Sequence, residues 1–274
     1  MAGLDPAIST RKARTSHRDR RDKPGDDTGG RATTADAMSY FELMGFGPKG
    51  WGWPMLMAAG MTVAVASCGF LVGAILGSLI AWAKLSRSLI LRSLGDGYTT
   101  VLRGIPDLLV IYLFYFGGSA VLSRVGQWFG GSGGFVSVPA FAVGALAIGV
   151  ISAAYQAEVF RGAYTALARG EIEAAKSVGM HTMLLFRRII APQVLRYAIP
   201  GLGNVWQLAL KESALISVTG LVELLRQSAI GSGSTYKPFS FYFTAGMLYL
   251  VITTVSTWGF QRAEDYSMRG LRRA

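Results

Sequence analysis

The sequence has few of the side chains from which metal sites are built. It contains one cysteine, Cys68, and two histidines, His17 and His181, among 274 residues. A single cysteine excludes a disulfide within the chain and a cysteine-based metal site. Two histidines are too few for a histidine metal cluster. We therefore predict that the chain holds no metal.

Recognisable catalytic motifs are also missing. The sequence has no G-x-x-x-x-G-K-[ST] loop to cradle nucleotide phosphates, no H-E-x-x-H pair and no nucleophile elbow. The chain is therefore predicted to be non-enzymatic. A process that it drives against a gradient would need energy from a partner or from an ion.

Charged residues are scarce as well. They make up 16% of the sequence, and hydrophobic residues make up 51%, whereas a soluble domain is usually about a quarter charged. This composition predicts a polytopic membrane protein. The net charge of +11 does not indicate nucleic acid, because the Lys and Arg residues fall between apolar runs, as in cytoplasmic loops.

Five apolar stretches have the composition of transmembrane helices. The first, at residues 50–83, contains no ionisable residue, and its Gly69, Gly73 and Gly77 recur every four residues on one face. That spacing favours close packing against another helix. Residues 221–227 are predicted to form a short surface helix. The second stretch ends near residue 122, and the third covers residues 135–157. The fourth begins at residue 197, and the fifth covers residues 239–260.

Lys and Arg are frequent after the first, third and fifth stretches and rarer after the second and fourth. Under the positive-inside rule, this alternation places the N-terminus outside and the C-terminus in the cytoplasm. Residues 1–37 carry eight Lys or Arg and no apolar periodicity, so they are predicted to be a disordered N-terminal extension. Their charge opposes an outside N-terminus and favours Met38 as the true start. The alternative is a disordered tail that belongs to the protein.

Residues 171–200 are the longest charged segment with a helical pattern. The side chains of Ala174, Ala175 and Val178 are predicted to share one side of a short helix. Gly179 can then leave that helix in a left-handed conformation. A second helical run over residues 183–190 is predicted to stop before Pro192.

Two ionisable residues interrupt the fourth apolar stretch. Lys211 lies fourteen residues after Tyr197, which at ~1.5 Å per residue is about 21 Å into the bilayer. Lys211 and Glu212 are neighbours that point in different directions, and ionisable groups at this depth favour a role in a transport pathway. Asn204 and Gln207, three residues apart on one face, are candidates for lining a polar cavity.

Two further acids lie near the predicted cytoplasmic ends of the second and third stretches. They are Asp107 and Glu158. One interpretation is an interfacial ion pair with Arg103 or Arg161, and the other is contact with a substrate. The residue pattern favours neither.

Six positions in the charged segment match the EAA loop of bacterial ABC-importer permease subunits, and the segment resembles that loop. These are Glu173, Ala174, Ala175, Gly179, Ile189 and Pro192. The resemblance implies that the loop, residues 160–192, carries a cytoplasmic coupling helix that docks on an ATPase subunit. Ala191 departs from the pattern, because the family usually has Leu there. The alternative is a solvated loop between two membrane spans.

The similarity extends over most of the chain after the N-terminal extension. The pieces GYTTVLRGIPDLL, AYQAEVFRGA and KESALISVTGLVELL resemble permease subunits of polar amino-acid ABC importers. At Asp107 and at residues 211–215 the sequence resembles the Q-type subunit of histidine/lysine/arginine/ornithine and opine (octopine, nopaline) systems more than the wider family. Ser213, which lies in that run, is a further candidate for lining the substrate pathway.

This resemblance implies an all-α, MetI-like permease with five transmembrane helices, here residues 55–270, in a bacterial inner membrane. It also implies a set of partners. They are an ATPase dimer that binds ATP and magnesium, a second permease subunit (an M-type paralogue or another copy), a periplasmic substrate-binding protein and an amino-acid substrate. No cofactor is expected in this chain.

Two alternatives remain beside a basic amino-acid or opine importer. Within the class, the substrate is glutamate, glutamine or another polar amino acid. From a different class, the chain is an ion-driven secondary transporter, although such proteins usually show two related repeats or broken helices around a midplane site. A membrane-bound hydrolase would need a nucleophile–base pair that the sequence does not offer.

Overall fold

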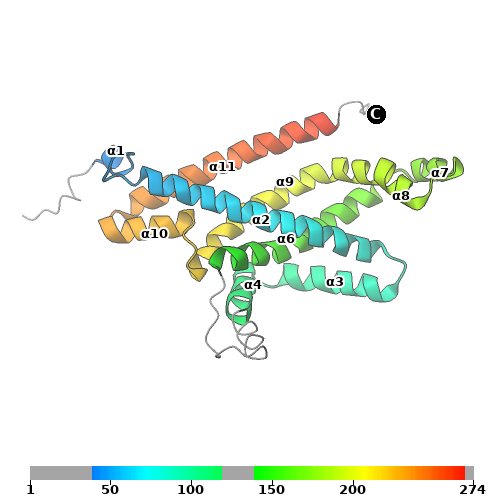
Figure 1. Ribbon diagram of the computed structural model, residues 1–274, viewed down its shortest axis with the longest axis horizontal. Coiled ribbons are helices and arrows are strands. Elements are labelled where there is room, and N and C mark those ends of the chain that lie inside the picture. Colours follow the sequence, from blue (N-terminus) through cyan, green and yellow to red (C-terminus); the bar gives the residue numbers. More distant parts are fainter. Residues whose placement is uncertain (1–38, 119–138, 269–274) are drawn as a thin grey trace, which may run out of the picture. The chain divides into compact units, whose positions relative to one another are not determined.

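The computed structural model describes residues 39–118 and 139–268. The predictions for residues 1–37, for the end of the second apolar stretch and for residues 135–138 lie outside these ranges. Within them, every regular element is a helix (Figure 1). In chain order the elements are α1 (Tyr40–Leu43), α2 (Gly52–Leu85), α3 (Leu89–Gly104), α4 (Asp107–Tyr112), η1 (Leu113–Gly117), α6 (Ala140–Thr165), α7 (Arg169–Ser177), α8 (Thr182–Leu185), η2 (Phe186–Ile190), α9 (Ala191–Leu215), η3 (Ile216–Thr219), α10 (Leu224–Thr235) and α11 (Pro238–Ser267).

The helices α2 and α6 pack along a seam of small side chains. Gly69, Gly73 and Gly77 of α2 are all buried, and a Cβ atom at Gly73 would lie 2.0 Å from Ser152 Oγ of α6. Gln156 of α6 donates a hydrogen bond across the seam to the backbone carbonyl of Phe70 at 3.0 Å. The prediction that the three glycines serve close packing is therefore confirmed.

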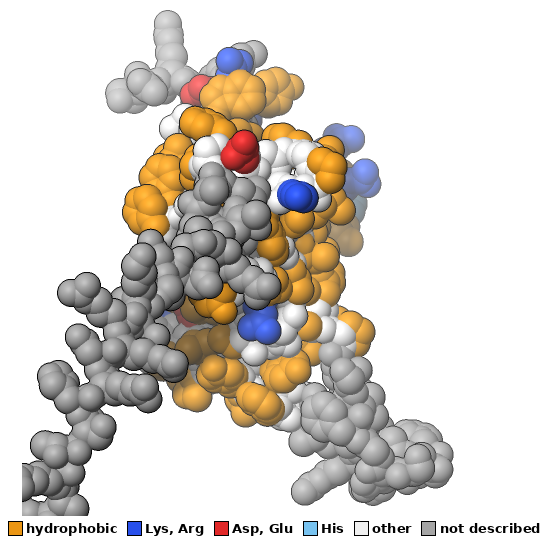
Figure 2. Space-filling model, turned by 90° about the vertical axis from the view of Figure 1, so that its left-hand side faces the viewer, with side chains coloured by type: hydrophobic (Ala, Val, Ile, Leu, Met, Phe, Trp, Pro, Cys, Tyr) orange, Lys and Arg blue, Asp and Glu red, His pale blue; other side chains and the backbone are white. Residues whose placement is uncertain are grey.

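The helix α6 is the central helix of the described bundle. Of its most apolar window 67% is buried, against 28% for α2 and 11% for α11. The surface left over is apolar: Figure 2 shows one face of the molecule, on which hydrophobic side chains predominate among the described residues. A helix that is apolar on its outward face as well as its inward face is typical of a membrane span.

The second predicted apolar stretch is not one straight helix. The helix α3 ends at Gly104, and the pair formed with residues 107–117 bends by 105°. Ile105 has the extended conformation (φ −94°, ψ 141°) that a following proline favours, and Pro106 is the N-cap of α4. The bend therefore follows from the Ile–Pro step.

The fourth stretch begins earlier than predicted, at Ala191 in place of Tyr197. The prediction that the preceding helical run stops before Pro192 is wrong. A π-helix, η2, continues directly into α9, and the Ala191 N–H bonds to the Phe186 carbonyl five residues back. Pro192 is the second residue of α9, directly after the change from the π-helical to the α-helical pattern.

The short helix predicted at residues 221–227 is α10, and it is not a surface helix. Its N-cap, Glu223, and its first residue, Leu224, are fully buried. The Glu223 carboxylate accepts hydrogen bonds from the backbone N–H of Arg226 and from the Tyr249 hydroxyl of α11. The Leu224 N–H donates to the Thr62 hydroxyl of α2. These bonds join α10 to two membrane helices.

Three helices, α2, α6 and α11, are long and apolar enough to cross a membrane, and the bent pair α3–α4 adds a fourth candidate. The 25 residues of α9 span about 37 Å at ~1.5 Å per residue, also enough to cross. Its polar residues keep its hydropathy lower. Counted together, these elements agree with the five predicted spans.

Candidate coupling and transport sites

The turn after α7 depends on Gly179. Its φ is +80°, and it is followed by two backbone hydrogen bonds that close a Schellman motif, from Gly179 N–H to the Lys176 carbonyl and from Met180 N–H to the Ala175 carbonyl. The predicted left-handed exit from the helix is confirmed. The chain then enters α8, where His181 Nδ1 accepts from the Leu184 N–H.

The residues of the EAA pattern are distributed over two sides of this loop. Ala175 is 4% exposed, whereas Glu173 and Ala174 are exposed. Val178 is 73% exposed and Met183 69%, so an apolar surface remains beside the turn. The predicted shared face of small residues is therefore wrong in part: Ala175 faces the protein, and its neighbours face outward.

The end of the EAA pattern lies at the start of α9. Ile189 belongs to η2 and is half-buried, and Pro192 is exposed. Glu171 of α7 accepts a hydrogen bond from Gln193 of α9. The loop is thus tied to the helix that carries Lys211 and Glu212.

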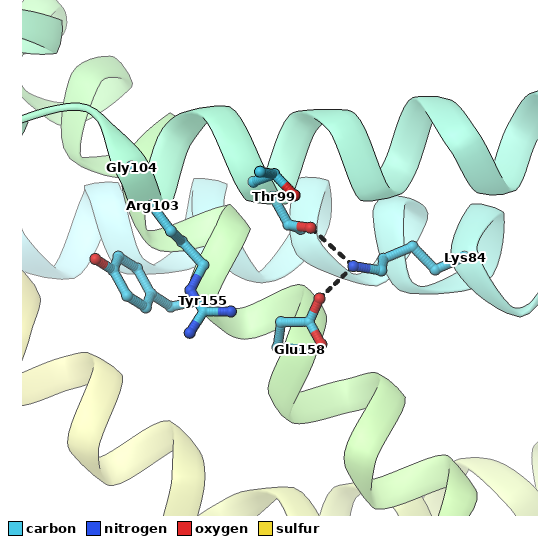
Figure 3. Close-up of a pocket in the computed structure, with 7 residues that line it drawn as sticks. Lys84, Thr99, Arg103, Gly104, Tyr155 and Glu158 are labelled. Carbon is cyan, nitrogen blue, oxygen red and sulfur yellow. Dashed lines mark hydrogen bonds and ion pairs between the residues drawn. The ribbon is translucent and has the colours of Figure 1, made fainter.

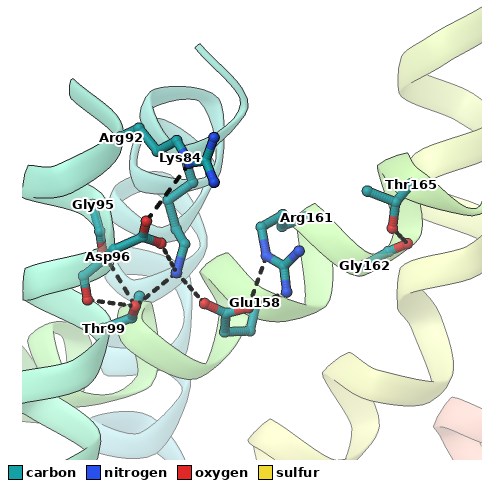
Figure 4. A network of polar contacts seen from close by, with 9 residues as sticks. All are labelled: Lys84, Arg92, Gly95, Asp96, Thr99, Glu158, Arg161, Gly162 and Thr165. Atoms are coloured by element: carbon teal, nitrogen blue, oxygen red, sulfur yellow. Dashed lines mark hydrogen bonds and ion pairs between the residues drawn. The ribbon is translucent and has the colours of Figure 1, made fainter. Parts of the chain in front are cut away.

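A polar network joins α2, α3 and α6 (Figure 4). The side chain of Lys84, 6% exposed, pairs with Asp96 of α3 at 3.0 Å and with Glu158 of α6. Lys84 also donates a hydrogen bond to the Thr99 hydroxyl at 2.8 Å. Arg161 binds the other oxygen of Glu158 at 2.8 Å. Glu158 therefore forms the ion pair with Arg161 that was one of its two interpretations, and a second pair with Lys84 that the sequence analysis did not consider.

A hollow of about 420 Å³ adjoins this network (Figure 3). Lys84 and Glu158 line one part of it, and Arg103 and Tyr155 line another. The Arg103 guanidinium lies over the Tyr155 ring, 5.4 Å from its centroid, in a cation–π contact. Arg103 thus lies against an aromatic ring, and the pairing with Asp107 or Glu158 that was one interpretation of those acids is not among the ion pairs of the described residues.

A second hollow of about 360 Å³ lies between α6 and α9. Tyr155 lines both this hollow and the first one. Asn204 and Gln207, the candidates for lining a polar cavity, both line this hollow together with Lys211, and their part in a transport pathway stays a prediction. Gln207 also donates to the Thr257 hydroxyl of α11 at 2.8 Å, which fixes its amide.

Glu212 points away from Lys211, as expected for neighbours on a helix. It is 2% exposed, and neither carboxylate oxygen has a hydrogen-bond partner in the described part of the chain. Asp107 of α4 and Tyr155 of α6 lie within electrostatic range of it. A buried carboxylate without a donor is costly, so this position calls for a bound proton or a cation.

Two further side chains of α9 lie outside the two hollows: Ser213, a candidate for the substrate pathway, and Trp206. Ser213 is buried and bonds back to the Leu210 carbonyl at 2.7 Å, so its hydroxyl satisfies its own helix. Trp206 packs edge-on against Phe70 of α2 at 5.5 Å. Neither side chain faces one of the two hollows.

Sequence reasoning missed Lys84, Asp96, Thr99 and Tyr155. A signal was present: Asp96, Thr99 and Arg103 recur at helical spacing and form one polar stripe on α3. Lys84 of α2 contacts this stripe. In the sequence it follows an uncharged apolar stretch, and nothing there distinguishes it from a lysine in a loop.

Comparison with known proteins gives the same class as the geometry. Residues 69–265 match the family described as "Binding-protein-dependent transport system inner membrane component". Over 236 residues the chain is 64% identical to the "Octopine transport system permease protein OccQ" of Rhizobium meliloti, which covers 86% of this chain and 99% of that protein. It is 36% identical to the "Histidine/lysine/arginine/ornithine transport system permease protein HisQ" of Escherichia coli, covering 80% of this chain and 96% of that protein.

A solved structure supports the fold. The crystal structure of an amino acid ABC transporter with histidines matches with a TM-score of 0.66 at 30% identity, covering 79% of this chain and 95% of the matched chain. The family match covers more than half of the chain. The chain therefore belongs to the family of inner-membrane components of binding-protein-dependent transport systems. Its predicted class, a non-catalytic permease subunit of an ABC importer with an all-α fold, is confirmed.

Proposed function

We propose that this chain is the permease subunit of an ATP-driven importer of basic amino acids or opines. The observation that carries the substrate class is the 64% identity to an octopine permease across nearly all of that protein's length. The side chains agree with a cationic cargo, because a buried carboxylate, Glu212, lacks a donor and lies close to Asp107. A guanidinium or ammonium group would supply that donor.

The cargo pathway in this proposal runs past Tyr155, between the two hollows. Asp107 and Glu212 attract the cationic group from one side. Asn204, Gln207 and Lys211 line the hollow where a carboxylate of the cargo would find donors. Glu158 stays paired with Lys84 and Arg161 at the edge of the path, and Ser213 keeps α9 intact at this depth.

Coupling to ATP is proposed to act through the loop of residues 160–192. The exposed Val178 and Met183 and the outward Glu173 and Ala174 form the face that would dock on an ATPase subunit. Ile189 and Pro192 would carry the movement into α9, because η2 continues directly into that helix. Docking of the ATPase shifts the equilibrium between the outward-open and inward-open states of the permease only if the ATPase binds the two states with different affinities.

The proposed assembly contains an ATPase dimer, which supplies the ATP and magnesium sites, a second permease subunit and a periplasmic binding protein. The domain of residues 55–270 would lie in the inner membrane, with its N-terminus outside and its C-terminus in the cytoplasm. The alternation of Lys and Arg between apolar stretches supports this orientation.

The proposal is tested by Glu212→Gln, which removes the charge and keeps the shape. Uptake of labelled arginine by the complete transporter should fall by roughly tenfold or more, because the loss of one charge-assisted hydrogen bond is worth ~1.5–3 kcal/mol. Asp265→Asn, an exposed acid at the end of α11, is the matched control and should leave uptake unchanged. Equal uptake by the two variants would contradict the role of Glu212.

A further inference from the structure

Glu212 is an acid that lies in an apolar part of the bundle. Its side chain is 2% exposed, and neither of its carboxylate oxygens has a hydrogen-bond donor among the described residues. Ala209 and Ile216, three residues before it and four after it, lie near the same face and are fully buried. Both belong to a hydrophobic core together with Ile111 of α4 and Ile151 of α6. An ionised carboxylate in these surroundings is strongly disfavoured.

The described part of the chain offers Glu212 no compensating cation. Glu212 is not among the ion pairs of these residues. The adjacent Lys211 points in another direction, because it is exposed and lines the hollow between α6 and α9. The helix α2, which also packs against α9, has no Lys, Arg, Asp or Glu at residues 52–83.

The titratable groups around Glu212 add negative charge. Asp107 of α4 and Tyr155 of α6 lie within electrostatic range of it. Two neighbouring carboxylates repel each other when both are ionised. The neighbours of Glu212 within this chain therefore favour its uncharged form.

Glu223, a second fully buried glutamate, has the donors that Glu212 lacks. Its carboxylate accepts hydrogen bonds from the backbone N–H groups of Leu225 and Arg226, at 2.9 and 2.7 Å, and from the Tyr249 hydroxyl of α11 at 3.2 Å. Donors of this kind replace the hydration that a buried carboxylate loses. Without them, a bound proton is the remaining way to remove the charge of Glu212.

We propose that Glu212 carries a proton while the pathway is empty, and that a cationic cargo replaces this proton. The inference rests on the function proposed above, in which the cationic group of the cargo binds at Glu212 and Asp107. When the cargo binds, the O–H bond of the Glu212 carboxyl breaks and the proton passes to solvent. The carboxylate then accepts a hydrogen bond from the guanidinium or ammonium group. Charge at Glu212 is thus balanced in both states, and each cargo molecule bound releases one proton.

The first test uses the purified complex of permease and ATPase subunits without cargo. Infrared spectroscopy distinguishes a protonated carboxylic acid from a carboxylate by its C=O stretching band, which shifts in deuterated water. At neutral pH the wild type should show this band and Glu212→Gln should lack it. Asp265→Asn, at an exposed acid of α11, should keep it.

Glutamine resembles the protonated acid in shape and charge, so Glu212→Gln should unfold at the same temperature as the wild type. A wild-type complex without the band, or a band that persists in Glu212→Gln, would overturn the proposal. A cation supplied to Glu212 by the second permease subunit would give the first of these results.

The second test measures the released proton. Arginine binding to the same complex, without the binding protein, is followed by calorimetry at neutral pH in two buffers with different ionisation enthalpies. The wild type should release about one proton per bound arginine, and the residual binding by Glu212→Gln should release none.

The outcomes separate this exchange from the function on which it rests. Arginine binding that depends on Glu212 but releases no proton would overturn the exchange and leave the proposed function intact. If Glu212→Gln binds arginine as tightly as the wild type, Glu212 does not contact the cargo. Both the exchange and the role of Glu212 in the proposed function would then be wrong.

Discussion

Gly179 ends α7 with a φ of +80° and allows both hydrogen bonds of the Schellman motif to form. A Cβ atom at this position would meet nothing within 4 Å, so space does not require glycine there. The backbone conformation does, because a β-branched residue pays about 1–2 kcal/mol in the left-handed region. The geometry of the coupling turn is thus set by one residue.

Substitutions at Gly179 should therefore distinguish the effect of backbone strain at this position from the effect of side-chain size. Gly179→Val is expected to reduce ATP-dependent uptake several-fold at equal protein level, whereas Gly179→Asn should keep most of it, since Asn tolerates the left-handed region. Gly170→Ala, in the first turn of α7 with open space around it, is the control. Uptake that is the same in the Val and Asn variants would show that the turn does not depend on this conformation.

Lys84 is the residue that brings three helices together through charge. Its side chain is 6% exposed and contacts Asp96, Thr99 and Glu158. Removing one member of a largely buried ion pair leaves its partners without compensation. Arg161 remains on Glu158, which moderates that cost.

Lys84→Met should lower the free energy of unfolding by about 2 kcal/mol, less than the full cost of an uncompensated buried charge because Glu158 retains Arg161. Thermal unfolding of the purified transporter measures the effect. Arg92→Met is the comparison: Arg92 is 65% exposed and lies 3.9 Å from Asp96, and such a pair contributes less than ~0.5 kcal/mol. Similar destabilisation in both variants would mean that the network does not stabilise the bundle.

At the scale of the helices, the seam between α2 and α6 determines how the bundle packs. Gly73 faces Ser152 Oγ and Gln156 Nε2, at 2.0 and 2.8 Å from the position of a Cβ atom. Neither atom can retreat far, since Gln156 is bonded to the Phe70 carbonyl and both residues are fully buried. Any side chain at residue 73 therefore forces the two helices apart.

Gly73→Val should destabilise the folded protein by about 3 kcal/mol, at the upper end of the cost of overpacking. The measurable result is a lower thermal midpoint and less protease-resistant protein in the membrane. Gly60→Val, on the same helix where a Cβ atom meets nothing within 4 Å, should have no such effect. If the two valine variants are equally stable, the seam is looser than described.

The helices show which features the sequence could predict. The span of α2 and the glycine seam were predictable, because length, apolar composition and four-residue spacing are local properties. The bend at Ile105–Pro106 was missed although the Ile–Pro step is a local signal for it. The continuous helix through Pro192 was not predictable, because it depends on the π-type hydrogen bond from the Ala191 N–H to the Phe186 carbonyl. The burial of α10 was missed because its seven-residue pattern gives no hint of Thr62 and Tyr249, which lie far away in the sequence.

The same division holds for the candidate sites. The shared cavity of Asn204, Gln207 and Lys211 follows from positions on one helix. The role of Glu158 was left open, because its partner Lys84 is 74 residues away and no local pattern connects them. Long-range pairs of this kind appear only when the helices are packed together.

At the scale of the whole molecule, the described part of the chain combines a loop that resembles the EAA loop, two hollows beside α6 and an apolar exterior (Figure 2), and the sequence contains no recognised nucleotide-binding motif. Family membership assigns it to binding-protein-dependent transport. Such a permease depends on partners for energy, so the chain alone should be inactive. A self-sufficient secondary transporter would behave in the opposite way.

The measurement that tests this most directly is uptake of labelled arginine and octopine into proteoliposomes. The chain is reconstituted alone and together with its second permease subunit, its ATPase and its binding protein, with and without ATP. We predict uptake only from the complete set with ATP, and none from the chain alone under a proton or sodium gradient. Uptake by the chain alone, driven by an ion gradient, would contradict the coupling role assigned to residues 160–192.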